Sequence, residues 1–302
     1  MPSHLKELVR ARMEKTGESY AQALRQVRAR EERAPAAPDT PYSRSTGRAE
    51  SVADTAFSIA VVRADEALRP EEDRLFDDPY ASLFVAAGAH TAEATQRFVD
   101  LPFFRDGIRL RTRFIDDCVR DGLAAGLAQL VLLGAGFDTR GLRMPEIADH
   151  RASVYEVDTP DQLRRKQSVL ASAGVKMRLR AVYVPFDFHT DDFENQLAVA
   201  LEAKGFRRDA GALFVWEGVI GYIDGAAIDR TLRFTASAGG SRSRLVFTFG
   251  QSSFAPDTAA ERLRRIGFSA CQEIAADELW RRYLPGEPHP AAWVMKIGTA
   301  MV

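Results

Sequence analysis

The chain has 302 residues, of which 46% are hydrophobic and 27% charged, and its formal net charge is −1. This is an ordinary globular composition, with room for one large α/β domain and an appendage or for two modest domains. The near-neutral charge argues against nucleic-acid binding through a global field. No apolar run approaches the roughly 20 residues that span a bilayer, and residues 1–10 are too charged for a secretory signal. We therefore expect a cytoplasmic protein that binds neither nucleic acid nor membrane.

The two cysteines, Cys118 and Cys271, stand apart without the spacing of metal ligands. No cluster of histidine, aspartate and glutamate has that spacing either. We therefore expect a reducing compartment and no metal site.

The first 45 residues are predicted to form an N-terminal arm. Helical spacing of apolar residues predicts a helical hairpin over residues 3–33, and three prolines make residues 34–42 a stiff linker. Glutamates offset much of the arginine charge in the hairpin, which favours a packing or homodimerisation arm over a nucleic-acid contact. The second predicted domain covers residues 46–302.

Helical periodicity then predicts a helix over residues 53–68, a second helix starting after Asp78 with Pro79 at its first position, and a third over residues 105–127. Because these helices precede the first strand, we expect residues 46–127 to form a helical lid over the site. Five phenylalanines in this region are candidates for the wall of an apolar acceptor pocket, although most are expected to be packing residues: Phe57, Phe84, Phe98, Phe103 and Phe104.

Strands and helices alternate over residues 128–302. Strands are predicted at residues 129–133, 153–157, 178–182, 212–216, 244–249, 269–273 and 293–298, and helices at residues 161–173, 191–203, 226–238 and 258–266. Such alternation predicts an α/β fold with a doubly wound, mostly parallel, Rossmann-like sheet of seven strands. In such a sheet, ligands bind beyond the carboxyl ends of the strands.

The first predicted strand runs into Gly134, Ala135 and Gly136, followed by Asp138. Glycine lets the backbone turn tightly and approach a ligand closely, although a merely structural turn is an equally good interpretation of this stretch alone. The third small residue of a dinucleotide-binding motif is missing, because Thr139 stands in its place. A ligand with ribose and adenine but no pyrophosphate therefore fits better, which favours S-adenosyl-L-methionine.

The other strand ends add polar residues to the same edge. Asp158 follows the second strand and is placed to accept hydrogen bonds from ribose hydroxyls. Asp187 and Phe188 follow the third strand and are candidates for the adenine, while Glu217 follows the fourth. Each residue alone has a structural interpretation, as a cap, a turn or part of the core. Four such coincidences at four successive strand ends are much less probable.

At this point the sequence resembles the leucine carboxyl methyltransferase-like family of class I S-adenosylmethionine-dependent methyltransferases, in the bacterial branch that includes polyketide O-methyltransferases. The matching stretches follow the family order: residues 55–56, 63–66, 75–81, 111–117, 134–140, 156–158 with Pro160 and Lys166, and 217–219 with Tyr222. The resemblance implies that Arg111 grips the methionine carboxylate, that residues 134–136 approach the cofactor, and that Glu217 faces its amino group or sulfonium. Asp138 and Arg140 take supporting roles. For Arg63, a salt bridge and a functional role remain equally supported.

The resemblance implies an O-methyltransferase whose acceptor is a carboxylate or phenolic hydroxyl of a small metabolite, such as a polyketide. A carboxylate acceptor needs no general base, whereas a phenol would benefit from one, and no histidine of this chain stands in a motif that singles it out. We therefore assign no catalytic residue. The alternatives are a protein C-terminal carboxyl methyltransferase and a non-catalytic cofactor-binding interaction protein.

Overall fold

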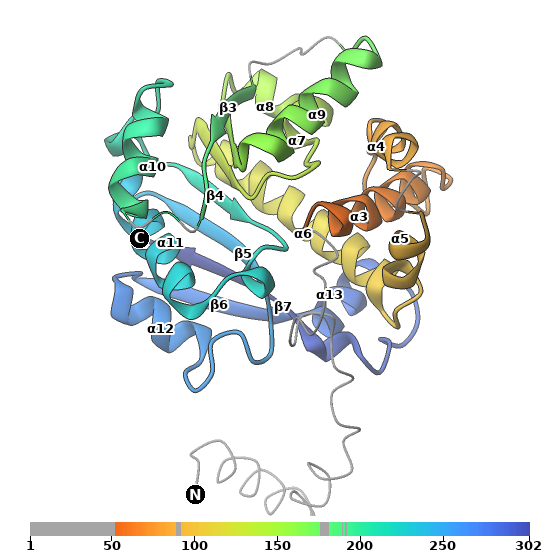
Figure 1. Cartoon of the computed structure of the whole chain (residues 1–302). Coiled ribbons are helices and arrows are strands. Elements are labelled where there is room, and N and C mark those ends of the chain that lie inside the picture. Colours follow the sequence, from red (N-terminus) through yellow and green to blue (C-terminus); the bar gives the residue numbers. More distant parts are fainter. Residues whose placement is uncertain (1–51, 89–91, 176–180, 189, 191) are drawn as a thin grey trace, which may run out of the picture. The chain divides into compact units, whose positions relative to one another are not determined.

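The computed structural model describes residues 52–88, 92–175, 181–188, 190 and 192–302. The predicted N-terminal hairpin and its linker lie outside these residues. Figure 1 shows a central sheet with helices on both sides.

The sheet has seven strands in the order β3-β2-β1-β4-β5-β7-β6. All neighbouring strands are parallel except that β7 runs antiparallel to β5 and β6. The predicted doubly wound, mostly parallel Rossmann-like fold is confirmed. The strands are β1 (Gln129–Leu133), β2 (Ser153–Asp158), β3 (Ala181–Pro185), β4 (Leu213–Trp216), β5 (Arg244–Gly250), β6 (Ala270–Ala275) and β7 (Met295–Met301).

Strand β3 extends further along the chain than predicted. The sequence prediction ended at residue 182, but Tyr183 and Val184 continue the ladder opposite Glu156 and Val157 of β2. The error arises because a single sequence does not show which residues before Pro185 pair with β2.

The helices in the described residues are α3 (Val52–Ala67), α4 (Ala81–Ala87), α5 (Ala92–Val99), α6 (Phe104–Ala124), α7 (Arg140–Arg143), α8 (Pro145–Asp149), α9 (Pro160–Ser172), α10 (Phe193–Glu202), α11 (Gly225–Ala238), α12 (Ala259–Ile266) and α13 (Ala276–Tyr283). The sequence prediction did not separate out α5, α7, α8 and α13, which are at most eight residues long. Such short helices show too few turns for a periodic pattern.

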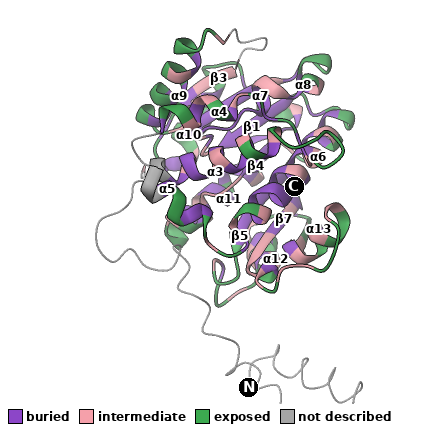
Figure 2. Cartoon of the chain, turned by 90° about the vertical axis from the view of Figure 1, so that its right-hand side faces the viewer, coloured by how far each residue is buried: buried purple, intermediate pink, exposed green. Residues whose placement is uncertain are grey.

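Strand β1 lies inside the sheet, between β2 and β4, and is buried along its whole length. Because side chains alternate across a strand, Leu130 and Leu132 belong to the hydrophobic cluster that contains α6, whereas Val131 and Leu133 belong to the cluster with α10 and α11. The burial pattern in Figure 2 shows the same arrangement, with buried residues along the strands and the inner faces of the helices. Helix α6, which the sequence prediction grouped with the lid, packs on the sheet.

A third hydrophobic cluster joins α3 and α4 to the rest of the domain. It contains Phe57 of α3, Phe84 of α4 and Phe137 of the loop after β1. The Phe84 and Phe137 rings stack with their centroids 4.5 Å apart, and the Phe57 and Phe137 centroids are 4.9 Å apart. This cluster holds α3 beside the carboxyl ends of the central strands.

Candidate functional site

A cavity of about 290 Å³ lies at the carboxyl ends of the central strands, with α3 on its other side. All nine residues that the sequence analysis selected for the cofactor line this one cavity, although they come from five separate segments: Arg111, Gly134, Ala135, Gly136, Asp138, Asp158, Asp187, Phe188 and Glu217.

The glycine turn after β1 forms part of the cavity wall. Gly134 and Gly136 have φ angles of +70° and +47°. The N–H groups of Gly134 and Ala135 both donate to the Val157 carbonyl, at 2.8 and 3.0 Å, which ties the turn to the end of β2. A Cβ atom on Gly134 would lie 2.3 Å from Cγ2 of Val219. Glycine is therefore required both by the backbone angle and by the lack of space.

Asp158 closes the same turn. Its Oδ2 accepts a hydrogen bond from the Gly136 N–H at 2.7 Å, and its Oδ1 accepts one from the Thr159 N–H at 2.7 Å. Burial raises the pKa of Asp158 above its ordinary value, and these two hydrogen bonds only partly oppose that effect. Glu156, two residues earlier, lies on the other side and pairs with Lys166 at 2.6 Å. The structure thus directs Asp158, not Glu156, toward the cavity.

Asp187 and Phe188 enter the cavity wall from the loop after β3. Phe188 is also part of the core, with its ring 5.7 Å from that of Phe193, and Phe186 packs on the same ring at 5.3 Å. Because Phe186 does not line the cavity, Phe188 is the better candidate of the two for a stacking surface.

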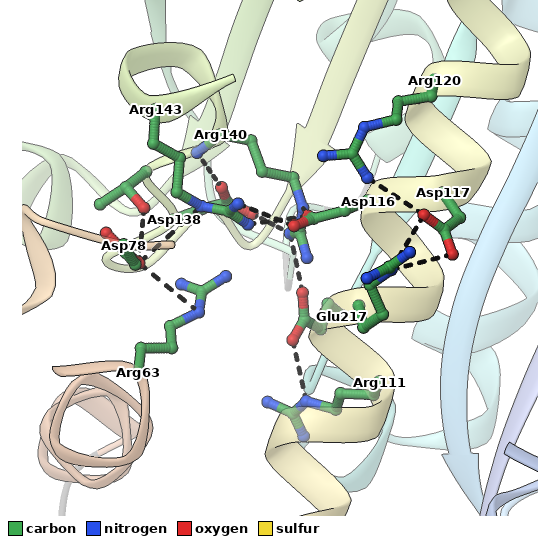
Figure 3. A network of polar contacts seen from close by, with 12 residues as sticks. Arg63, Asp78, Arg111, Asp116, Asp117, Arg120, Asp138, Arg140, Arg143 and Glu217 are labelled. Atoms are coloured by element: carbon green, nitrogen blue, oxygen red, sulfur yellow. Dashed lines mark hydrogen bonds and ion pairs between the residues drawn. The ribbon is translucent and has the colours of Figure 1, made fainter. Parts of the chain in front are cut away.

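A chain of charged groups runs from the cavity into the protein interior (Figure 3). Glu217 accepts from Arg111 Nε through Oε1 and from Arg140 Nη1 through Oε2, both at 2.8 Å. Arg140 is fully buried and also donates to Asp116, at 2.8 Å, and to Asp138. Arg140 therefore fixes both carboxylates that face the arginine side of the cavity.

The arginines keep these carboxylates ionised. Burial alone would raise the pKa of Glu217, but Arg140, Arg111 and Arg63 together outweigh burial and hold that pKa well below its usual range. Burial is likewise outweighed at Asp138, where Arg140 and Arg63 lower the pKa. Neither carboxylate is therefore a good proton acceptor near neutral pH.

Comparison with known proteins supplies the family. The model of the family "Leucine carboxyl methyltransferase" matches residues 56–236. A protein of Frankia alni named "Putative S-adenosyl-L-methionine-dependent methyltransferase" is 40% identical over 178 residues, which cover 57% of this chain and 60% of that protein. A protein of the same name from Mycobacterium sp. (strain JLS) is 33% identical over 251 residues, 78% of this chain and 76% of that protein. The chain belongs to the leucine carboxyl methyltransferase family.

Among solved structures, one described as a "putative methyltransferase" from Thermobifida fusca is 14% identical, with a TM-score of 0.47, and the match covers 83% of this chain and 94% of that one. The resemblance inferred from the sequence is confirmed by the family match, and S-adenosyl-L-methionine is the cofactor that membership implies. The cavity fits such a molecule, because it offers bare glycine backbone and both signs of charge.

The cavity has a second wall, formed by α3 and α9, that the sequence did not predict. Besides Arg63, four residues of α3 line the cavity, and so do three polar residues of α9: Thr55, Ala56, Ile59, Ala60, Asp161, Gln162 and Arg165. Their positions on helix surfaces look like ordinary packing or solvent-facing positions in a single sequence. None of the five phenylalanines considered as candidates for the acceptor pocket lines this cavity, and the expectation that most of them are packing residues is confirmed. Four of them are buried in hydrophobic contacts, and Phe104 is partly buried beside Phe98.

Asp78 also differs from its prediction. Helix α4 begins at Ala81, with Tyr80 at the N-cap, so Asp78 does not cap it. Instead its side chain is buried and accepts from Thr139 Oγ1 at 2.7 Å, which joins the lid to the loop after β1. Short-range capping rules could not reveal a partner 61 residues away.

Within the described ranges, no group of three or more histidine, cysteine, aspartate or glutamate residues is arranged to hold a metal ion. In the same part of the chain, none of the helices combines the length and apolar character needed to cross a membrane.

Proposed function

We propose that this family member is an S-adenosylmethionine-dependent O-methyltransferase that acts on a carboxylate of a small metabolite, such as a polyketide. The observation that carries the proposal is that the nine residues predicted from the sequence to bind the cofactor all line one cavity. Asp158 would hold the ribose hydroxyls, Asp187 and Phe188 the adenine, and Glu217 the amino group. Arg111 would hold the carboxylate of the methionine part, for which a forked guanidinium is suited.

When bound, S-adenosylmethionine supplies a methyl group that is already activated by a positively charged sulfur. The chain's own task is then to align the acceptor oxygen and exclude water, an effect worth several orders of magnitude in rate. Helix α3 gives this side of the cavity small and apolar residues, Ala56, Ile59 and Ala60, which suit the apolar body of an acceptor.

The described residues that line the cavity favour a carboxylate over a phenol as the acceptor. Neither histidine nor lysine is among the described residues that line it. Glu217 and Asp138 are held ionised by arginines and have lowered pKa values, so they are weak bases. A carboxylic acid is already ionised near neutral pH, so it needs no such help.

The first test measures cofactor binding. Asp158→Asn removes the charge that accepts the ribose hydroxyls, and S-adenosylhomocysteine affinity measured by calorimetry should fall by about 10- to 100-fold. The exposed Asp149→Asn on α8 is the matched control and should leave the affinity unchanged. Equal affinities for the Asp158 variant and wild type would remove Asp158 from the site, and no binding by wild type would refute the function.

The second test measures transfer of a labelled methyl group to paired panels of carboxylic acids and phenols with matched carbon skeletons. Methyl esters should form in preference to aryl methyl ethers. Products confined to phenols would contradict the carboxylate assignment. Label recovered only in protein bands of a lysate would instead support a protein carboxyl methyltransferase.

The raised pKa of Asp158 predicts a pH dependence of cofactor affinity. A protonated carboxyl group accepts hydrogen bonds poorly, so S-adenosylhomocysteine should bind more weakly as the pH falls through the pKa of Asp158. Because the pKa is raised, this loss should begin at a higher pH than an ordinary aspartate would produce. Asp158→Asn cannot titrate, and its affinity should vary less over the same range. Equal pH profiles for variant and wild type would contradict this assignment.

A further inference from the structure

Arg63 of α3 is a buried cation that has only long contacts. Its side chain is 5% exposed. Nη1 lies 3.5 Å from the Phe137 carbonyl oxygen, and Nε lies 3.9 Å from Asp78 Oδ2 and has no hydrogen-bond partner. Ordinary N–H···O hydrogen bonds are about 2.7–3.2 Å long. Most of the hydrogen-bonding capacity of this guanidinium is therefore unused.

The acids around Arg63 make shorter contacts elsewhere. Asp78 Oδ2 accepts from Thr139 Oγ1 at 2.7 Å. Glu217 uses one oxygen for Arg111 and the other for Arg140. Arg63 forms an ion pair with Asp78 at 3.9 Å, and so long a contact compensates the buried charge only in part. An anion that enters the cavity would therefore find a ready partner in Arg63.

Arg63 and Arg111 face the same part of the cavity from opposite elements. Both line the cavity, and both contribute to the lowered pKa of Glu217. Figure 3 shows the two guanidinium groups directed from α3 and α6 into the space beside Glu217. Arg111 uses Nε for Glu217, while its terminal nitrogens lie beside the Gly218 backbone, where a Cβ atom would be 3.3 Å from Nη2. The guanidinium groups of Arg63 and Arg111 thus lie on two sides of a space where both could donate hydrogen bonds to the oxygens of one carboxylate.

We propose that Arg63 joins Arg111 in holding the carboxylate of the cofactor's methionine part, so that helix α3 itself recognises this end of the cofactor. This inference rests on the cofactor site given under the proposed function. It makes Arg63 a residue that determines specificity, because adenosyl compounds without the carboxylate lose the contact with α3. It also explains why this buried cation keeps hydrogen-bonding capacity that its protein neighbours do not use.

The test compares S-adenosylmethionine with decarboxylated S-adenosylmethionine, which lacks only the carboxylate. Affinities are measured by calorimetry for wild type, Arg63→Gln and Arg63→Lys. Arg63→Gln should weaken S-adenosylmethionine binding by about 10- to 100-fold while leaving the decarboxylated compound within about twofold of wild type. Arg63→Lys keeps the charge but loses the fork, so it should show a smaller loss with the same selectivity.

The matched control is Arg105→Gln, an exposed arginine of α6 that pairs with Asp65 of the same helix α3. It should leave both affinities unchanged. Unchanged S-adenosylmethionine affinity in Arg63→Gln, or an equal loss for both compounds, would overturn the proposal. If Arg63→Gln does not fold, Arg63→Lys provides the test. A loss of affinity for S-adenosylmethionine alone supports the proposal, and no loss or an equal loss for both compounds overturns it. Failure of wild type to bind either compound would instead refute the proposed function.

Discussion

Replacing Arg140 by methionine is expected to lower the free energy of unfolding by about 3–5 kcal/mol at neutral pH, since breaking a buried ion pair from one side leaves uncompensated charge. Arg140 is fully buried and contacts Asp116, Asp138 and Glu217. Methionine fills much of the volume but offers no charge, so three buried carboxylates lose a shared cation. Urea unfolding followed by circular dichroism measures the change.

The same variant has a predictable pH dependence. In the wild type, the lowered pKa values of Glu217 and Asp138 mean that their stabilisation is present above the ordinary carboxylate pKa and is lost as the pH falls through the folded-state values. Without Arg140 these pKa values rise, so the difference in stability between variant and wild type should shrink as the pH falls. Arg281→Met, at an exposed ion pair of α13, should change stability by less than about 1 kcal/mol. A pH-independent loss in the Arg140 variant would contradict this explanation.

Replacing Gly134 by alanine is expected to lower S-adenosylhomocysteine affinity by at least about tenfold. The added Cβ atom would lie 2.3 Å from Val219 Cγ2, and the φ angle of +70° adds backbone strain of about 1–2 kcal/mol. Both effects displace the turn that faces the cavity. Calorimetry measures the affinity, and thermal unfolding measures the accompanying loss of stability.

Gly174→Ala separates the two causes. Gly174 has a similar φ angle of +66°, but no atom lies within 4 Å of its Cβ position. This variant should show the strain alone and keep the cofactor affinity of wild type. Adding Val219→Ala to Gly134→Ala removes the colliding methyl group and should recover part of the lost affinity. If both alanine variants behaved alike, steric contact with Val219 would not be the cause.

The sequence predicted the cavity wall formed by strand ends because that wall depends on local patterns. An apolar run ended by glycine identifies β1 and its turn, and the rule that ligands bind at carboxyl ends of parallel strands places Asp158 and Glu217 near it. These two inferences required no knowledge of which helices cover the sheet. The prediction of a doubly wound, mostly parallel sheet succeeded for the same reason.

The opposite wall and the ion network could not be predicted in this way. Asp78 contacts Thr139 across 61 residues of sequence, and Asp116 contacts Arg140 across 24, and a single sequence does not reveal which polar groups will pair. The face of α3 that lines the cavity contains small and apolar residues that resemble a packing surface. Its one phenylalanine, Phe57, does not line the cavity and instead packs on Phe137.

The position of β7 constrains the order in which the sheet can be completed during synthesis. Residues 295–301 lie between β5 and β6 and pair with seven residues of β5 and six of β6. Until this last strand has left the ribosome, β5 has an open edge and β6 has no neighbour in the sheet. Strands β1, β2 and β4, whose ends line the cavity, pair with one another without β7, so their pairing does not depend on this last strand.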